Sequence, residues 1–158
     1  MIRHGTERDV GQLLAYEHGI NREELVNSIR AGRVLLLMET DTLVGWLRYN
    51  LFWDNTPFLN MLYILEPYRG MGHGSRLVGH WEAEMAARQY GRVLTSTLSS
   101  EQAQFFYRKQ GYVDCGALKL PEEPLEILFR KDLPAPKDKR VEWDGDAGLH
   151  NRVAEQEE

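Results

Sequence analysis

The chain has 158 residues, 42% of them hydrophobic and 27% charged, which is ordinary for one globular domain with its own core. A net charge of −5 without a basic stripe argues against nucleic-acid binding, and an acidic enzyme suits a cationic substrate such as an amine. The single cysteine, Cys115, excludes an internal disulfide and is expected to be a small core or strand residue. No apolar run is long enough for a membrane span, and no signal-peptide core follows Met1, so we expect a cytoplasmic protein.

Apolar periodicity, capping residues and glycines predict the elements of the first 133 residues. In chain order they are a strand at 1–4, helices at 6–17 and 21–32, strands at 33–39, 43–52 and 58–65, a helix at 74–91, a strand at 93–97, a helix at 100–110, and strands at 112–119 and 125–131. Three helix starts carry such patterns, in which Thr6 precedes Asp9, Asn21 precedes Glu24, and Ser99 precedes Gln102. Hairpins combined with one strand–helix–strand crossover predict an α+β fold around a mixed sheet.

The composition changes at Pro134, which divides the chain into a domain at 1–133 and a polar tail at 134–158. The tail holds four basic and seven acidic residues, a composition that is usually mobile. Trp143 and Leu149 are apolar enough to anchor it on a surface. Docking on its own domain, docking on a second subunit of a homodimer, and disorder all stay open.

The most informative stretch is the turn that begins at Arg69 and reads Arg-Gly-Met-Gly-His-Gly-Ser. Its glycines, Gly70, Gly72 and Gly74, lack the Cβ atom that would keep a ligand off the main chain, and they accept positive φ angles. The segment that follows places four apolar side chains on one helical face: Leu77, Val78, Trp81 and Met85. Free amides at a helix N-terminus predict an anion site, most often for phosphate.

Two common phosphate-binding loops do not match this turn. A P-loop requires a Lys followed by Ser or Thr after the last glycine, whereas this chain has Ser75 and Arg76 there. The dinucleotide fingerprint requires a glycine three positions after Gly72, and that position is Ser75. A glycine-rich strand–helix turn that binds no ligand stays an alternative.

Two signatures resemble those of the GNAT superfamily of acyl-CoA N-acyltransferases. The first is Arg69-x-x-Gly72-x-Gly74, which is similar to the R/Q-x-x-G-x-G/A pattern of that superfamily. The second is Phe-Tyr-Arg-Lys-Gln-Gly-Tyr at residues 106–112, which is similar to the F-Y-x-x-x-G-F/Y ending of its last helix. The order of strands and helices over residues 1–133 resembles the same fold. The resemblance implies a mixed central β-sheet of about seven strands flanked by four helices.

The resemblance also implies a binding site for acetyl-CoA, the acyl donor of the superfamily. The loop amides would hold the pyrophosphate, and the preceding strand would pair with the pantetheine arm through its backbone. The implied cofactor-binding residues are Leu62, Tyr63, Ile64, Arg69, Gly70, Met71, Gly72, His73, Gly74, Ser75 and Ser100. Ser100 stands where several relatives have Asn, so it offers a shorter hydrogen bond.

Tyr107 is the catalytic residue that the resemblance implies, as the acid that protonates the departing thiolate. A phenol has an unperturbed pKa of ~10, so it is protonated at neutral pH and can supply that proton. Two alternatives to this role stay open. Tyr107 could be a core residue, as aromatic residues at this helical spacing often are. Its hydroxyl could also form a hydrogen bond to coenzyme A without donating a proton.

The base and the acceptor site are not identified by the resemblance. Glutamates act as base in some relatives, and Phe58 and Thr95 occupy roughly those positions here. The expected acceptor-binding residues are Trp53, Asp54 and Glu122, which lie in loops that border the acceptor cleft in the superfamily. Asp54 and Glu122 could instead be solvated loop charges with no role in acceptor binding, and the same holds for Glu123, next to Glu122. Trp46 and Phe52 either wall the acceptor site or fill the core.

These patterns together predict an N-acetyltransferase that transfers acetyl from acetyl-CoA to a primary amine of a small molecule or peptide. A non-catalytic module that binds coenzyme A or acyl-CoA is the alternative. We expect no metal, because the histidines at 4, 18, 80 and 150 lack metal-ligand spacing. The acceptor and the acyl-chain length are not fixed by the sequence.

Overall fold

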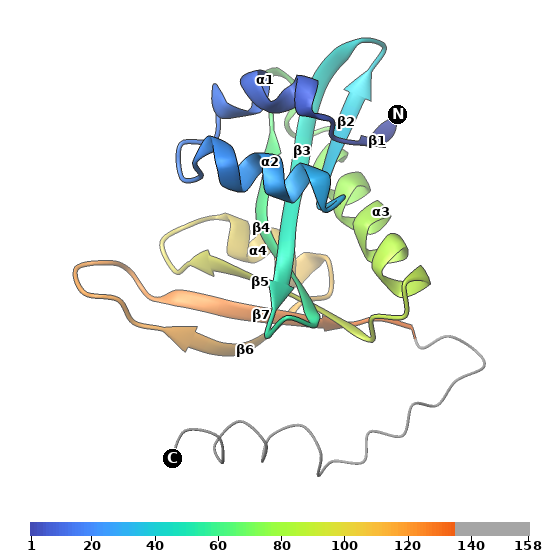
Figure 1. Cartoon of the computed structure of the whole chain (residues 1–158). Coiled ribbons are helices and arrows are strands. Elements are labelled where there is room, and N and C mark those ends of the chain that lie inside the picture. Colours follow the sequence, from blue (N-terminus) through green and yellow to red (C-terminus); the bar gives the residue numbers. More distant parts are fainter. Residues whose placement is uncertain (135–158) are drawn as a thin grey trace, which may run out of the picture.

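A computed structural model describes residues 1–134 and shows a seven-stranded mixed sheet (Figure 1). The strands are β1 (Ile2–His4), β2 (Val34–Glu39), β3 (Thr42–Phe52), β4 (Thr56–Ile64), β5 (Arg92–Leu98), β6 (Val113–Leu118) and β7 (Glu126–Asp132). The helices of these residues are α1 (Val10–Leu14), α2 (Arg22–Arg30), α3 (His73–Ala87) and α4 (Ala103–Lys109), with short 3₁₀ turns η1 (Glu7–Asp9) and η2 (Glu66–Tyr68). The predicted α+β class, sheet and helices are confirmed; the expected docking residues of the tail lie outside the described part.

The sheet separates two hydrophobic cores. Alternate residues of β2 point to opposite faces, so that Leu35 and Leu37 join one core while Leu36 joins the other. The first core is shared with α3 and α4, and the second with α1 and α2. Figure 1 shows α1 and α2 together on one side of the sheet and α3 on the other. No helix in residues 1–134 is long and apolar enough to cross a membrane.

Local signals set most of the helix boundaries. The side chain of Asn21 accepts a hydrogen bond from the Glu24 backbone N–H at 2.9 Å, so the predicted N-cap of α2 is confirmed. The predicted apolar face of α3 is confirmed too, because Leu77 and its three partners on that face are fully buried. The helix expected to end near residue 91 stops earlier, at Ala87.

Two further helix predictions were wrong in extent. The first helix ends at Leu14 instead of reaching Glu17, whose carboxylate turns inward and accepts hydrogen bonds from Arg48 at 2.7 Å and from Trp46 Nε1 at 3.1 Å. This buried ion pair holds Glu17 against the sheet just after the helix ends.

The last helix also starts later than predicted. The expected capping box at Ser99 does not form, and α4 begins at Ala103 after a series of turns. The side chain of Gln104 donates to the carbonyls of Ser99 and Glu101 instead, at 2.8 and 3.0 Å. These bonds stabilise the turn at the place where a first helical turn was expected.

Cys115 lies on the strand β6, which confirms the prediction of a core or strand residue. It is exposed, like the rest of β6, because this strand is the outer strand of the sheet beyond β7.

The strands β4 and β5 form the one parallel pair of this sheet, and they soon separate. They pair only at Phe58 with Leu94 and at Leu59 with Thr95. Next to this point β4 carries a bulge, because Tyr49 lies opposite Leu59 whereas Arg48 lies opposite Met61. Beyond the bulge, the edge of β4 that faces β5 has no strand partner in the described residues. The divergence opens the sheet where the predicted site begins.

Candidate active site

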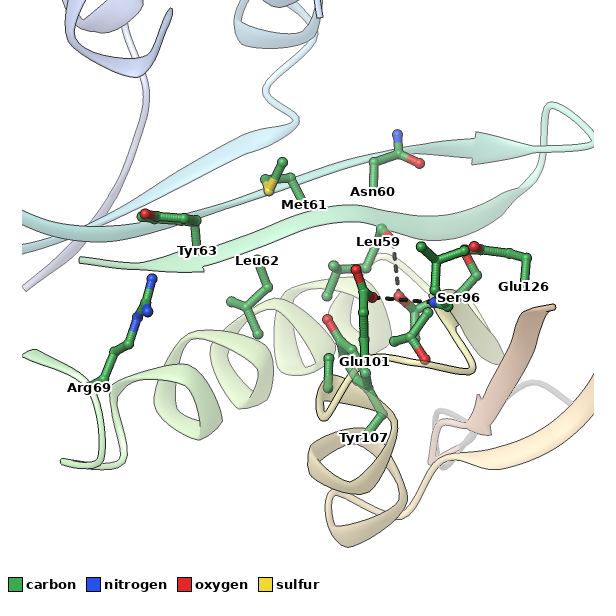
Figure 2. Close-up of a pocket in the computed structure, with 14 residues that line it drawn as sticks. Leu59, Asn60, Met61, Leu62, Tyr63, Arg69, Ser96, Glu101, Tyr107 and Glu126 are labelled. Carbon is green, nitrogen blue, oxygen red and sulfur yellow. Dashed lines mark hydrogen bonds between the residues drawn. The ribbon is translucent and has the colours of Figure 1, made fainter. Parts of the chain in front are cut away.

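A cleft of about 690 Å³ occupies the gap between β4 and β5 (Figure 2). It is lined by Leu59, Asn60, Met61, Leu62, Tyr63, Arg69, Thr95, Ser96, Thr97, Leu98, Glu101, Ala103, Tyr107 and Glu126. In Figure 2 Arg69 lies at one end of the cleft, while Ser96 and Glu126 lie at the other, with Glu101 and Tyr107 approaching from the α4 side. We call the end at Arg69 the loop end, and the end near Ser96, Glu101 and Glu126 the acidic end.

The glycine loop leads into α3 at the loop end. Gly70 and Gly72 have φ angles of +75° and +82°, which residues with a side chain rarely adopt. A Cβ atom built on either glycine meets no atom within 4 Å, so the backbone conformation and not packing requires glycine there. The 15-residue helix α3 begins at His73, directly after this turn. Turned amides and a helix N-terminus together fit an anionic group such as a diphosphate.

The side chain of Phe106 lies against the third glycine. A Cβ atom on Gly74 would lie 3.4 Å from Cζ of Phe106, an ordinary contact distance, so the start of α3 lies beside α4 at this point. The neighbouring Ser75 hydroxyl accepts a hydrogen bond from Gln110 Nε2 at 2.9 Å. The start of α3 and the end of α4 are therefore tied together, which links the loop to the helix that carries Tyr107.

Two side chains of the loop hold it against the sheet. Arg69 Nε donates to the carbonyl of Ile64 at 2.8 Å, and its guanidinium lies 5.3 Å from the centre of the Tyr63 ring. His73 Nε2 lies 3.4 Å from a carboxylate oxygen of Glu39. The side chain of Met71 is exposed.

The predicted strand residues lie along the cleft with their side chains on alternate faces. Figure 2 shows Leu62 pointing toward α3 and α4, whereas Met61 and Tyr63 point the other way. Ile64 packs with Leu62 in the core below α3. Tyr63 stacks on Trp46 at 4.8 Å between ring centres, and Trp46 is fully buried, so Trp46 fills the core and does not wall the cleft.

Tyr107 reaches the cleft from a largely buried position on α4. Its side chain is 5% exposed, and its ring packs against Tyr112 and Phe129. Burial raises the pKa of Tyr107 to about 12, a hydrogen bond with Thr95 opposes the rise, and the nearby charge of Glu101 adds to it. The phenol is therefore protonated throughout the neutral range. The ring belongs to the core and the residue also lines the cleft, while the roles of its hydroxyl toward coenzyme A stay predictions.

The acidic end contains residues that the sequence patterns did not single out. Glu101 Oε2 accepts a hydrogen bond from the Leu98 backbone N–H at 3.3 Å. Glu126 lies opposite Leu98 in the pairing of β5 with β7. The hydroxyl of Thr97, whose residue is 4% exposed, is buried without a hydrogen-bond partner among the described residues. Glu126 comes near Leu98 through the register of β5 and β7, whereas Glu101 reaches the Leu98 N–H within its own turn, three residues away.

Several predicted residues lie elsewhere. Trp53 and Asp54 are in the exposed turn between β3 and β4, where Trp53 lines a separate apolar pocket of about 300 Å³ with Phe52. Glu122 is in the exposed turn between β6 and β7, and Ser100 is exposed in the turn before α4. None of Trp53, Asp54, Glu122 and Ser100 lines the cleft between β4 and β5. No group of three potential metal ligands occurs in residues 1–134.

Known structures with the same fold cover nearly the whole described domain. Ard1 from Thermoplasma volcanium has a TM-score of 0.74 at 14% identity, with 85% of this chain and 97% of that chain covered. A ribosomal-protein-alanine N-acetyltransferase from Brucella melitensis has a TM-score of 0.70 at 25% identity, covering 84% and 99%. Naa50 from Arabidopsis thaliana, in complex with the bisubstrate analogue CoA-Ac-MVNAL, has a TM-score of 0.67 at 20% identity, covering 83% and 97%.

Sequence comparison gives the family directly. A search of curated protein sequences finds no significant match. The profile described as the Acetyltransferase (GNAT) family matches residues 7–112, a span that includes β4, the glycine loop, α3 and Tyr107. This chain therefore belongs to the GNAT family and is an acetyltransferase.

Proposed function

We propose that this acetyltransferase transfers the acetyl group of acetyl-CoA to a primary amine of a small molecule or peptide, by direct attack of the amine on the thioester. One observation carries the proposal: a cleft is lined at one end by Arg69, directly before the turned amides of the glycine loop, and further along by Tyr107, a buried and protonated phenol. The same cleft would hold the donor by its diphosphate and present its thioester carbon to the acceptor.

The loop end would bind the coenzyme A diphosphate. The amides around Gly70 and Gly72, together with the positive end of the α3 dipole, stabilise negative charge there. The pantetheine arm carries amide groups, and the open edge of β4 has unpaired main-chain groups to match them. Extended pairing with Leu62 and Tyr63 would then lead the arm from the loop toward Tyr107.

The chemistry at the other end needs a positioned thioester, a neutral amine and a proton for sulfur. Tyr107 is the residue that supplies the proton, since its raised pKa keeps it protonated. Proton transfer from a positioned acid typically contributes ~10²–10⁴-fold to the rate. Orientation of the two reactants contributes as much or more, so the binding of coenzyme A is as important for the rate as Tyr107.

An amine with a peptide-like body is the first acceptor class to examine. Two similar structures are, by name, a ribosomal-protein-alanine N-acetyltransferase and Naa50 with CoA-Ac-MVNAL. The carboxylates of Glu101 and Glu126 line the acidic end, which favours a cationic acceptor over an anionic one. Small polyamines share that charge and stay within the proposal.

The test is to incubate the full chain with acetyl-CoA and a panel of acceptors while free thiol is measured. The panel contains short peptides with a free N-terminus, the same peptides with a blocked N-terminus, and small amines. Thiol release that depends on a free amine, with acetylated amine found by mass spectrometry, is the expected result. Binding of acetyl-CoA without turnover of any amine would contradict the proposal and favour the non-catalytic module.

A further inference from the structure

We propose that Glu101 is the base that takes a proton from the acceptor amine. The inference rests on the proposed function and adds a catalytic residue to it. It starts from Thr95, which lines the cleft and whose hydroxyl donates to the carbonyl of Leu59 at 3.0 Å. A threonine hydroxyl is not a base at neutral pH, so the proton has to go elsewhere.

The lining of the cleft offers few groups that can accept it. It contains two carboxylates, those of Glu101 and Glu126, and no histidine. The hydroxyl of Thr97 is nine-tenths buried and has no partner among residues 1–134, so this wall of the cleft has a polar group free to bond to a ligand. The choice of base therefore lies between two residues.

The direction of one backbone N–H places the Glu101 carboxylate in the opening between β4 and β5. The N–H of Ser99 donates to the carbonyl of Leu125 on the β7 side. Because successive N–H groups along an extended chain point in opposite directions, the N–H of Leu98 points toward β4 and the cleft. Glu101 Oε2 accepts a hydrogen bond from this N–H at 3.3 Å. One carboxylate oxygen is held by the backbone, and the other is available to a ligand.

Glu101 also lies close to Tyr107, the residue that would meet the sulfur of the thioester. Burial is the larger cause of the raised pKa of Tyr107, and the charge of Glu101 adds to it. Figure 2 shows Glu101 and Tyr107 together below β4, whereas Glu126 lies on the β7 side at the end of the cleft. This geometry favours Glu101 as the base and leaves Glu126 to attract the cationic acceptor.

The proton balance of the step is complete with these groups. The acceptor ammonium gives one proton to the Glu101 carboxylate, which returns it to solvent. The nitrogen lone pair then forms a bond to the thioester carbon, the carbon–sulfur bond breaks, and its electron pair leaves with sulfur. Tyr107 donates its proton to sulfur, and the second nitrogen proton restores Tyr107 through water. The products are the amide, free coenzyme A and one released proton.

The test compares Glu101→Gln, Glu126→Gln and a surface control, Glu23→Gln in the first turn of α2, in the full chain. A glutamine at 101 can still accept from Leu98, so the turn is expected to fold, which thermal unfolding checks. Glu101→Gln should lower kcat about a hundredfold or more and keep the affinity for acetyl-CoA. Glu126→Gln should mainly raise the KM of the acceptor, and the control should match the wild type.

The kinetic defect of Glu101→Gln, measured with primary amines of decreasing basicity, shows whether Glu101 acts as a base or only supports the structure. A less basic amine needs less help to lose its proton, so the defect of Glu101→Gln should shrink along the series. Slow hydrolysis of acetyl-CoA without any amine gives a second readout, since water also needs a base, and this rate should fall in the same variant. A constant defect for all amines, or an unchanged kcat and hydrolysis rate, would overturn the assignment. Failure of the wild type to acetylate any amine would instead contradict the proposed function.

Discussion

The two ends of the cleft are built from different parts of the chain. The loop end is local and made mostly of main chain: Gly70 and Gly72 adopt positive φ angles just before α3 begins at His73. The acidic end is made of side chains that come from three separate elements, with Glu101 before α4, Tyr107 on α4 and Glu126 on β7. Binding of the donor and chemistry on the acceptor should therefore respond to different substitutions.

The two ends also make different demands on the sequence. A diphosphate needs only a ring of amides, and many sequences with the same glycines provide it. An acceptor and its proton need particular side chains at particular depths, and these depend on strand register. Here Glu126 reaches the cleft only because it pairs opposite Leu98.

The largest effect on kcat should come from Tyr107→Phe at the acidic end. The ring keeps its contacts with Tyr112 and Phe129, and the Thr95 hydroxyl keeps its bond to Leu59, so the protein should fold normally. We expect kcat to fall by ~10²–10⁴-fold because the sulfur loses its proton donor. Steady-state kinetics measure the fall, and calorimetry should find the affinity for acetyl-CoA retained. Loss of affinity with unchanged kcat would reverse the roles of the two ends.

A smaller effect, on the affinity for acetyl-CoA, should separate the matched variants Gly70→Asp and Gly70→Asn at the loop end. Both residues tolerate the positive φ angle better than most, and nothing lies within 4 Å of the added Cβ atom. Only Asp adds a negative charge beside the diphosphate, where repulsion of ~1–4 kcal/mol is expected. Calorimetry should find acetyl-CoA bound roughly tenfold or more weakly by Asp than by Asn. Equal affinities would place the diphosphate elsewhere.

The link between the two ends can be measured through the hydrogen bond from Gln110 to Ser75. Ser75→Ala and Gln110→Ala should each lower the free energy of unfolding by ~0.5–1.5 kcal/mol, because the bond that ties α3 to α4 is lost. Chemical denaturation of both single variants and the double variant gives the coupling. Additive effects would show that the bond does not join the two helices in solution.

The smallest effect should be that of alkaline pH on the chemical step. The pKa of Tyr107 is raised to about 12, so the phenol stays protonated well above its ordinary value. Because the acid form is the active form, ionisation of Tyr107 should not lower kcat as the pH rises to about 10. A pH–rate profile measured over the range in which the protein stays folded checks this. A decline of kcat with an apparent pKa near 8 or 9 that disappears in Tyr107→Phe would contradict the raised pKa of the phenol.

The sequence predicts the loop end better than the acidic end, for physical reasons. Glycine spacing and helix periodicity are local, so the turn at Gly70 and Gly72 and the buried face of α3 follow from neighbouring residues. Tyr107 follows from the resemblance to a family and not from its spacing. The sequence patterns do not mark Glu101 as a site residue, because they place it in the first turn of a helix at 100–110. In the structure α4 begins only at Ala103, so Glu101 lies in the preceding turn.

The expected acceptor residues show the same limit. Asp54 and Glu122 were chosen because loops border acceptor clefts, yet both lie in exposed turns outside the cleft lining. The reach of a loop depends on the bulge in β4 and on where β4 and β5 separate, and no residue of those loops encodes either feature. Long-range strand register therefore carries the information that the sequence patterns lacked.

The most direct measurement is an experimental structure of the protein with coenzyme A. We expect the diphosphate within hydrogen-bond distance of main-chain N–H groups between residues 70 and 75, the pantetheine arm along β4, and the sulfur beside the Tyr107 hydroxyl. A diphosphate bound away from the glycine loop, or a sulfur atom remote from Tyr107, would contradict this expectation.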